Sequence, residues 1–491
     1  MDNPKPVTVV EKIGHAIGMM LSTEYVKQMA TNDLLDACYA ASNEKEVDVC
    51  LQNKYLDMSV TGKNTGTVGY QMTPLMLACY LNNDGLLVSK ILNHQNGVDV
   101  NQINECGDTA LTLACRKGYF RNVELLITHD KLDVNLCHKG GISPLQLACS
   151  SGSLATVSSL LSHPNIIVEV NNNVHYPTIL CCMTNSLNKH DHSDLYKHQY
   201  VYLKLFEMVI CHPQTNVNAV NERGNSALHV LASKNNSAAA EVLINTCFKH
   251  NKQLDTNLEN VVGQTPLELA IENSNNDMVA FLLTLSDVKV DSEKCLRLAI
   301  RKGSADVFKS LLQSEHNVKI NKQVSESCFK ELRNWSGRHD TITQLFAPRD
   351  DVDVNVGNTM FNALSTGTHN FKLLLSNPNV DVNRITNVSE LFKEPGITVA
   401  TKQYGPVMSL LSYACVTSKN YHDENNDYID MLLSHPNIDV NALNSQALFV
   451  ACTLNLASTM LVLLGAGANI TPEIRCLNTS CIVNYLSLMS K

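Results

Sequence analysis

The feature that most constrains the fold of this chain is its internal repetition. Residues 107–135 are GDTALTLACRKGYFRNVELLITHDKLDVN, and residues 141–171 are GISPLQLACSSGSLATVSSLLSHPNIIVEVN. Charged and polar residues are exchanged between the two copies, whereas the Leu-Ala-Cys string, a Gly, a Leu-Leu pair and an Asn after a β-branched residue are kept. A pattern that keeps its apolar and turn positions indicates one packing unit used repeatedly.

The pattern recurs along most of the chain. Copies align on the residue expected to precede the first helix of each unit: Thr73, Thr109, Ser143, Tyr176, Ser226, Thr265, Lys294, Ser327, Thr359, Ser409 and Gln446. Most separations are about 33 residues, and two separations of 50 residues indicate insertions within repeats. The β-branched string before Asn or Asp keeps the same phase, at Asn101, Asn135, Asn171, Asn218, Asp291, Asn321, Asn355, Asn383 and Asn441.

Residues 263–291, GQTPLELAIENSNNDMVAFLLTLSDVKVD, show how one unit is expected to fold. Thr265 can cap a first helix, and Pro266 suits its first position because the missing N–H is harmless there. The residues predicted to face inward on the two helices are Leu267, Leu269, Ala270, Met278, Val279, Phe281, Leu282 and Leu283. One helix pair cannot cover both of its apolar faces, so the repeats are expected to stack.

The strings GYQMTPLMLAC, GISPLQLACSSG and GQTPLELA resemble the Gly-x-Thr-Pro-Leu-His-x-Ala pattern of ankyrin repeats. The resemblance covers roughly residues 65–472. It implies an all-α solenoid of about eleven stacked antiparallel helix pairs, several of them degenerate, with β-hairpin-like turns and helical caps at both ends.

The resulting domain prediction has five parts. Residues 1–64 form a helical region and capping repeat, and residues 65–322 form ankyrin repeats with an insertion at about 183–200 in the fourth. Residues 323–356 form a degenerate repeat. Residues 357–472 form further repeats with insertions at about 386–408 and 416–427, and residues 473–491 form a capping helix. In the second insertion, Pro395 and Gly396 favour a small hairpin or ordered loop.

The 17 cysteines do not indicate a disulfide framework. Many end a Leu-Ala-Cys-like string, where a small thiol serves as a compact buried apolar group: Cys79, Cys115, Cys149, Cys182, Cys415 and Cys452. The amino-terminal segment is better explained as an amphipathic capping helix than as a signal peptide. Together these features favour a reducing compartment, hence the cytoplasm, with the nucleus or a host-cell cytosol as alternatives.

Several functional classes are disfavoured. The formal charge of −9 is spread along the chain without a basic run, which argues against nucleic acid as a partner. No stretch has the roughly 18 apolar residues of a membrane span. There is no Gly-rich phosphate loop, because GAGAN at residues 465–469 is a helix exit with Gly467 at its carboxyl end, and no cofactor is predicted.

An enzyme remains the competing class, either a Cys hydrolase or a metal-dependent activity built from the inserted loops. The first insertion carries His190, Asp191, His192, Asp194 and His198, but such polar clusters are common in exposed loops, and no metal site is predicted. His229 is expected to form a structural hydrogen bond between neighbouring turns and to have no catalytic role.

The favoured function is a non-enzymatic, monomeric, intracellular scaffold or adaptor that binds a partner protein on the concave ankyrin face. A microbial effector acting on host proteins is the alternative within this class. The candidate contact residues lie on the hairpin tips and first helices: Asn104, Glu105, Thr112, Arg116, Lys117, His138, Lys139, Gln146, Asn221, Glu222, Arg223, His229, Glu268 and Arg301. Their mixed charges suit a protein or peptide better than a polyanion.

The Asp-Val-Asn strings also suggest modification, because the resemblance to ankyrin repeats implies possible targets of asparaginyl hydroxylases. Asn383 and Asn441 fit best, each with a Leu eight residues earlier. The alternative is structural: an Asn whose side chain secures the turn between repeats.

Overall fold

The computed structural model describes residues 23–39, 44–53, 55–59, 61, 71–81, 83–94, 97–168, 179–186, 195–316, 318–332, 340–364, 368–387, 406–418, 427–477 and 483. The regular structure is almost entirely helical, as the sequence predicts. The chain divides into two compact units, residues 1–269 and 270–491, which are described separately.

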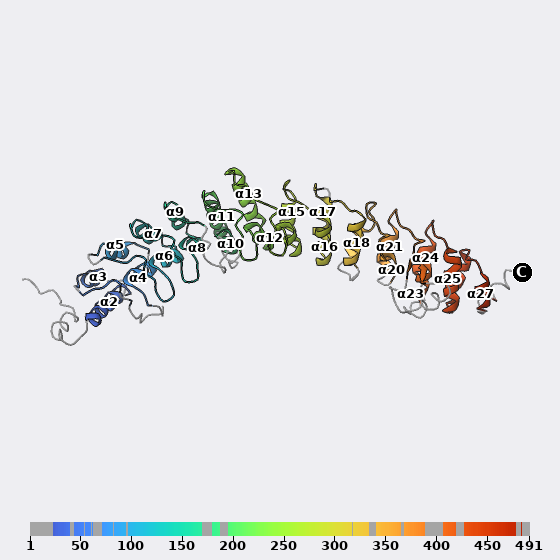
Figure 1. Ribbon diagram of the computed structural model, residues 1–491, viewed down its shortest axis with the longest axis horizontal. Coiled ribbons are helices and arrows are strands. Elements are labelled where there is room, and N and C mark those ends of the chain that lie inside the picture. Colours follow the sequence, from blue (N-terminus) through green and yellow to red (C-terminus); the bar gives the residue numbers. More distant parts are fainter. Residues whose placement is uncertain are drawn as a thin grey trace, which may run out of the picture. The chain divides into compact units, whose positions relative to one another are not determined.

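The first unit is a series of helix pairs. Its elements are α2 (Thr23–Tyr39), α3 (Glu44–Leu51), α4 (Pro74–Leu81), α5 (Leu86–Leu92), α6 (Ala110–Lys117), α7 (Phe120–Ile127), α8 (Pro144–Ser151), α9 (Leu154–Leu161), α10 (Ile179–Ser186), α11 (Leu195–Cys211), α12 (Ala227–Ser233), α13 (Ser237–Lys249) and the start of α14 (Pro266–Glu272). The first helix α6 packs between α4 and α8, and the second helix α7 packs between α5 and α9. Figure 1 shows these pairs following one another in chain order, which confirms the predicted stacking.

The second unit continues the same architecture. Its elements are α15 (Asn276–Leu282), α16 (Ser292–Lys302), α17 (Ala305–Gln313), α18 (Lys322–Glu331), α19 (Asp340–Phe346), α20 (Thr359–Ala363), α21 (Thr368–Leu375), β1 (Ile385–Asn387), β2 (Val407–Ser409), α23 (Leu410–Ser418), α24 (Asp427–Leu433), α25 (Ala442–Thr453), α26 (Ala457–Gly465) and α27 (Pro472–Cys476). Helix α16 packs on α18, and α17 packs on α15 and α19. The segment expected to be most degenerate therefore contains a helix pair, α18 and α19, with Phe346 packed against Phe308 and Phe329.

The cysteines of the Leu-Ala-Cys strings lie in the cores of the units. Cys79, Cys115 and Cys149 are fully buried on α4, α6 and α8. Burial raises the pKa of the Cys115 thiol well above its usual value, with a further contribution from its neighbours Cys79 and Cys149. Cys415 and Cys452 are likewise buried in the second unit, whereas the side chain of Cys182 lies outside the described residues. For the five described residues, the predicted role as compact apolar groups is confirmed.

Helices α16 and α18 are among the first helices that begin earlier than the aligned sequence positions suggested. Helix α16 is capped by Asp291, whose carboxylate accepts the N–H of Lys294, and α18 is capped by Asn321, whose amide oxygen accepts the N–H of Val324. Lys294 and Ser327 therefore lie inside helices and are not cap residues. Asp and Asn are strong N-cap residues, so here the end of the β-branched string starts a helix directly.

The insertions are described only at their bases. Strands β1 and β2 form an antiparallel pair, with Ile385 opposite Ser409, at the base of the second insertion. The predicted turn at Pro395 and Gly396 lies outside the described residues. The same holds for residues 419–426 in the third insertion, for His190, Asp191, His192 and Asp194 in the first, and for the side chain of His198.

The Asn residues of the Asp-Val-Asn strings connect successive repeats. The side chain of Asn135 donates from Nδ2 to the carbonyl of Asn165 at 2.7 Å and accepts the N–H of Ile167 at 2.8 Å. The same two-bond pattern occurs at Asn101, Asn218, Asn355, Asn383 and Asn441. The turn itself is held by the Asp two residues earlier, as where Asp133 Oδ1 accepts the N–H of Asn135 at 2.9 Å. The Asn side chains thus have the structural role given above as the alternative to modification. They bond to the turn of the next repeat, whereas their own turn is held by the residue two positions earlier.

We expect Asn135→Ala to lower the free energy of unfolding of the first unit by about 1–2 kcal/mol, because two inter-repeat hydrogen bonds are lost at a partly exposed site. The measurement is urea unfolding followed by circular dichroism. Asn165→Ala is the matched control, since Asn165 contributes its main-chain carbonyl and its main-chain N–H to these turns. Equal losses in the two variants would show that the Asn135 side chain does not stabilise the array.

Candidate protein-binding surface

Among the described residues of the first unit, four turns lie between a second helix and the next first helix, and we call them tips: residues 104–108, 138–142, 221–225 and 260–264. Each is closed by a hydrogen bond from the N–H of its first residue to the carbonyl of its fifth, at 2.9–3.0 Å. In three tips the first residue is Asn, and its side-chain oxygen accepts further main-chain N–H groups. These three tips are therefore ordered by local Asx turns before any partner binds. In tip 138–142 the Nδ1 atom of His138 accepts the N–H of Gly140 instead.

The third residue of each first helix faces inward. Thr112, Gln146, His229 and Glu268 form reciprocal caps with Thr109, Ser143, Ser226 and Thr265. All four are 5% exposed or less, and Asn104 is only 7% exposed. These five predicted contact residues thus offer almost no surface to a partner, because their side chains are buried within the helix caps and the tip. The capping-box pattern, Thr or Ser three residues before a polar residue, could have signalled this from the sequence.

His229 confirms the structural role expected of it. Its Nε2 lies 2.9 Å from the carbonyl oxygen of Gln264 in the next tip, and its Nδ1 lies 2.9 Å from the hydroxyl of Ser226. Because a carbonyl can only accept, Nε2 carries the proton. Because Nδ1 accepts the main-chain N–H of Ser226 at 3.2 Å, it carries none, and the imidazole is neutral. Burial lowers the pKa of His229, opposed by the hydrogen bond to Gln264.

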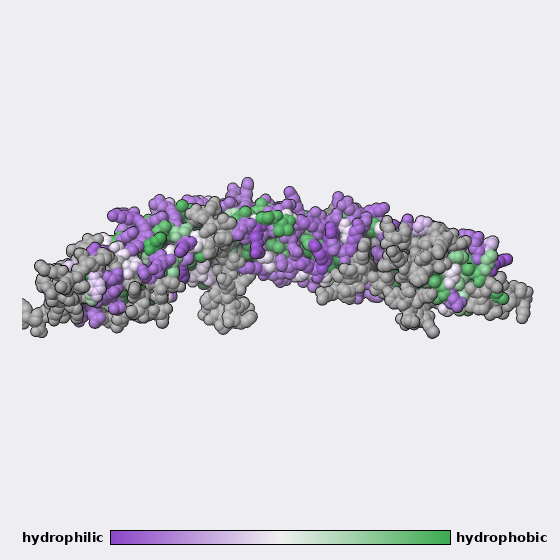
Figure 2. All heavy atoms as spheres, turned by 60° about the horizontal axis from the view of Figure 1, so that its bottom comes forward, coloured by the Kyte–Doolittle hydropathy of each residue, from purple (hydrophilic) through white to green (hydrophobic). Residues whose placement is uncertain are grey.

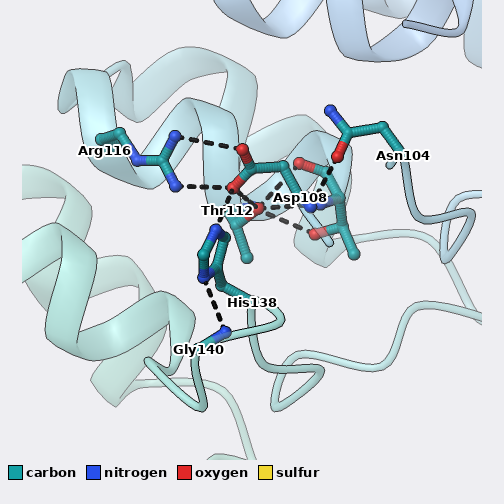
Figure 3. A network of polar contacts seen from close by, with 7 residues as sticks. Asn104, Asp108, Thr112, Arg116, His138 and Gly140 are labelled. Carbon is teal, nitrogen blue, oxygen red and sulfur yellow. Dashed lines mark hydrogen bonds and ion pairs between the residues drawn. The ribbon is translucent and has the colours of Figure 1, made fainter. Parts of the chain in front are cut away.

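A polar network fixes a cationic group at the surface beside the second tip (Figure 3). The carboxylate of Asp108 is 6% exposed and accepts two hydrogen bonds from Arg116, at 2.6 and 3.1 Å. It also accepts the hydroxyl of Thr112 at 3.2 Å, and His138 Nε2 lies 3.9 Å from it. His138 Nδ1 accepts the N–H of Gly140 at 3.0 Å, so its remaining ring nitrogen faces Asp108. The guanidinium of Arg116, 43% exposed, is thereby held in one orientation.

The remaining predicted contact residues do reach the surface. Glu105, Arg116, Lys117, Lys139, Glu222 and Arg223 are exposed in the first unit, and His138 and Asn221 are half-buried. The ammonium of Lys117 lies 4.3 Å from the ring centre of Tyr80. Arg301 is exposed on α16 of the second unit. The face drawn in Figure 2 is largely hydrophilic with small hydrophobic patches.

Exposed valines in and beside two of the tips were not predicted from the sequence. Val220, Val261 and Val262 are 46%, 75% and 79% exposed. The signal was present in the string NVVG at residues 260–263, where two β-branched residues occupy turn positions that usually carry Gly, Asn, Asp, Ser or Pro.

The described residues show little that supports catalysis. They contain no group of three or more His, Cys, Asp or Glu placed to hold a metal ion. Cys211 Sγ lies 3.3 Å from His250 Nε2, but burial and the nearby Glu207 raise the pKa of this thiol, which disfavours the thiolate that a nucleophile needs. No helix in the described part of the chain is long and apolar enough to cross a membrane.

Comparison with known proteins decides the family. A model of ankyrin repeats, three copies long, matches residues 34–136, 75–174, 197–294 and 252–324, which together cover more than half of the chain. The chain belongs to the ankyrin-repeat family. The matches end at residue 324, so the expected total of eleven repeats stays a prediction. No curated protein sequence matches the chain.

Solved structures of ankyrin proteins are similar to parts of this ankyrin-repeat protein. The ankyrin repeat domain of Bcl-3 has 19% identity and a TM-score of 0.41, over 51% of this chain and 97% of that one. The ankyrin-repeat protein EF0377 has 19% identity and a TM-score of 0.36, over 44% and 97%. A chain of the Bdellovibrio bacteriovorus complex of endopeptidase Bd0816 with immunity protein Bd3460 has 24% identity and a TM-score of 0.32, over 43% and 98%.

Hydroxylation of Asn383 and Asn441 is a separate proposal. Both amides are engaged, but the Nδ2 bond of Asn441 to the carbonyl of Gly467 is 3.2 Å long, against 2.6 Å for Asn383 to Asn437. We expect an asparaginyl hydroxylase to act on Asn441 first, after local opening of the last repeats. Intact mass after co-expression tests this: a gain of one oxygen atom, mapped to Asn441, supports it, and an unshifted mass removes it.

Proposed function

We propose that this ankyrin-repeat protein is a non-enzymatic cytoplasmic adaptor, which binds a partner protein on the surface formed by the tips and first helices. In ankyrin arrays this is the concave face. The observation that carries the proposal is that exposed charged side chains are mounted on turns and helices already fixed by buried contacts, as Arg116 is by Asp108. Binding then requires little further ordering, which favours affinity.

The chemistry of the surface favours a partner with mixed polarity. Lys117, Lys139 and Arg223 are cationic and Glu105 and Glu222 are anionic, and all five side chains are exposed in the first unit. Charges of both signs arranged on a rigid surface contribute mainly specificity and association rate. A protein surface or peptide carrying both signs is therefore the expected partner.

The test is affinity capture from cytosolic extract with the full chain and with a variant in which Lys117, Lys139, Glu222 and Arg223 are changed to Ala. A control variant with the same charge change carries Arg121→Ala, Lys131→Ala, Glu241→Ala and Lys249→Ala, on or beside second helices. We expect a partner that is retained by the wild type and the control and lost by the first variant, with equal unfolding temperatures. A partner retained equally by all three chains would contradict the proposal.

A further inference from the structure

The tips of the first unit pack on one another. A Cβ atom added to Gly107 would lie 2.3 Å from the Cβ of Lys139, and one added to Gly224 would lie 2.7 Å from the main-chain nitrogen of Val261. The N–H of Val261 donates to the carbonyl of Arg223 at 3.0 Å, and Asn260 Nδ2 donates to Asn225 Oδ1 at 3.0 Å. Tip 260–264 therefore covers tip 221–225 with both main-chain and side-chain bonds.

Tip 260–264 differs from tips 104–108 and 221–225 in what lies over it, and from all three other tips in what it exposes. A Cβ added to Gly263 would meet nothing closer than Glu259 Oε2, at 3.9 Å. The two residues after the first position are Glu-Cys, Lys-Gly and Glu-Arg in the other tips, but Val-Val here. Both valines are about three-quarters exposed. The neighbouring tip thus covers the fourth residue of tips 104–108 and 221–225, Gly107 and Gly224. The same side of tip 260–264, at Gly263, is open, and the two exposed valines beside it are apolar.

This apolar tip is rigid. The N–H groups of Val262 and Gln264 both donate to Asn260 Oδ1 at 3.0 Å, and the N–H of Gly263 donates to the carbonyl of Asn260 at 2.8 Å. Valine is poorly suited to turns, and its exposed methyl groups gain nothing from the fold itself. A partner that covered them would gain apolar burial without having to order the turn.

We propose that Val261 and Val262 dock an extended segment of the partner protein. The main chain of that segment contacts tip 260–264 as the main chain of Val261 contacts Arg223 in tip 221–225. The carbonyl of Val262 corresponds to that of Arg223, so it accepts a main-chain N–H of the incoming segment. An apolar side chain of the segment covers the valines. A Lys or Arg beside it meets the exposed carboxylate of Glu259. This inference rests on the proposed adaptor function and names the kind of segment recognised.

The experiment uses ten-residue peptides selected from a random display library on the full chain, with affinities measured by fluorescence anisotropy. We expect the selected peptides to combine β-branched or other apolar residues with Lys or Arg. Val261→Asp with Val262→Asp should weaken binding at least tenfold, and the smaller change Val261→Thr with Val262→Thr should weaken it in the same direction. Glu259→Lys should lower the affinity for peptides that carry Lys and raise the affinity for versions in which that Lys is replaced by Glu.

Several results would overturn the inference. Selected peptides that are acidic, or that bind the valine variants as well as the wild type at unchanged unfolding temperature, would show that the tip is not the docking site. A wild-type dimer that the aspartate variants convert to a monomer would make a second copy the occupant. Peptides whose binding depends on Lys117, Lys139, Glu222 and Arg223 but not on the valines would support the adaptor function and exclude this docking site. Peptides whose binding depends on the valines but not on those four residues would support the docking site and contradict the proposed charged surface.

Discussion

Replacing Gly224 with Ala should lower the free energy of unfolding of the first unit by about 2–5 kcal/mol, since two costs combine. The residue has φ +70°, where an L side chain costs about 1–2 kcal/mol. In addition, the new methyl group would lie 2.7 Å from the main-chain nitrogen of Val261, and relieving such overpacking costs about 1–3 kcal/mol. Because the clashing atom is main chain, the neighbouring tip must move and its bond to Arg223 is lost.

Gly263→Ala is the matched control. Its φ of +74° imposes the same conformational cost, but the space around its Cβ is open. We expect a loss of about 1–2 kcal/mol for this variant, so the difference between the two isolates the packing of one tip on the next. Urea unfolding and amide hydrogen exchange at residues 221–225 and 260–264 measure it. Equal losses would mean that the two tips move apart without cost in free energy. The rigid tip on which the docking proposal depends would then not exist.

The sequence allowed the helix pairs, their phase and the buried cysteines to be predicted, because all three depend on apolar spacing within one repeat. Leu267 and Met278 are buried as expected from that spacing. Leu269, Phe281 and Leu283 are only half-buried, and Leu283 is the C-cap residue that follows α15. The starts of α16 and α18 differ from the alignment, because Asp291 and Asn321 end the β-branched strings as expected but also cap these helices.

The candidate surface was harder to predict, because it depends on contacts between repeats. Thr112 and Gln146 resemble variable surface positions in a linear sequence, yet the fold turns them inward to cap their own helices. The ion pair of Asp108 with Arg116 joins the tip to its first helix, and only the structure shows that the carboxylate is buried. Val261 and Val262 stand out only once the fold shows that neither packs inside the array.

His229 should make the first unit sensitive to acid. Its pKa is lowered by burial from the value of about 6.5 expected in the unfolded chain, so the unfolded state binds the proton more readily than the folded state. Stability from the neutral imidazole is therefore fully present above pH of about 6.5 and is lost as the pH falls towards the folded-state pKa. Above that window, His229→Leu should cost about 2–3 kcal/mol, because the bonds to Gln264 and Ser226 are broken in a buried site.

The measurement is urea unfolding of the wild type, His229→Leu and Ser143→Ala between pH 5 and pH 8. The wild type should lose its advantage over His229→Leu as the pH falls below 6.5, at no more than about 1.4 kcal/mol per pH unit. Ser143→Ala removes the cap of another first helix, α8, at a cost of about 1 kcal/mol, and leaves the hydrogen bonds of His229 intact, so its curve should stay parallel to that of the wild type. Curves for the wild type and His229→Leu that are parallel at every pH would show that the ring titrates alike in both states. In that case the burial of His229 would not be the cause of the acid sensitivity of the first unit.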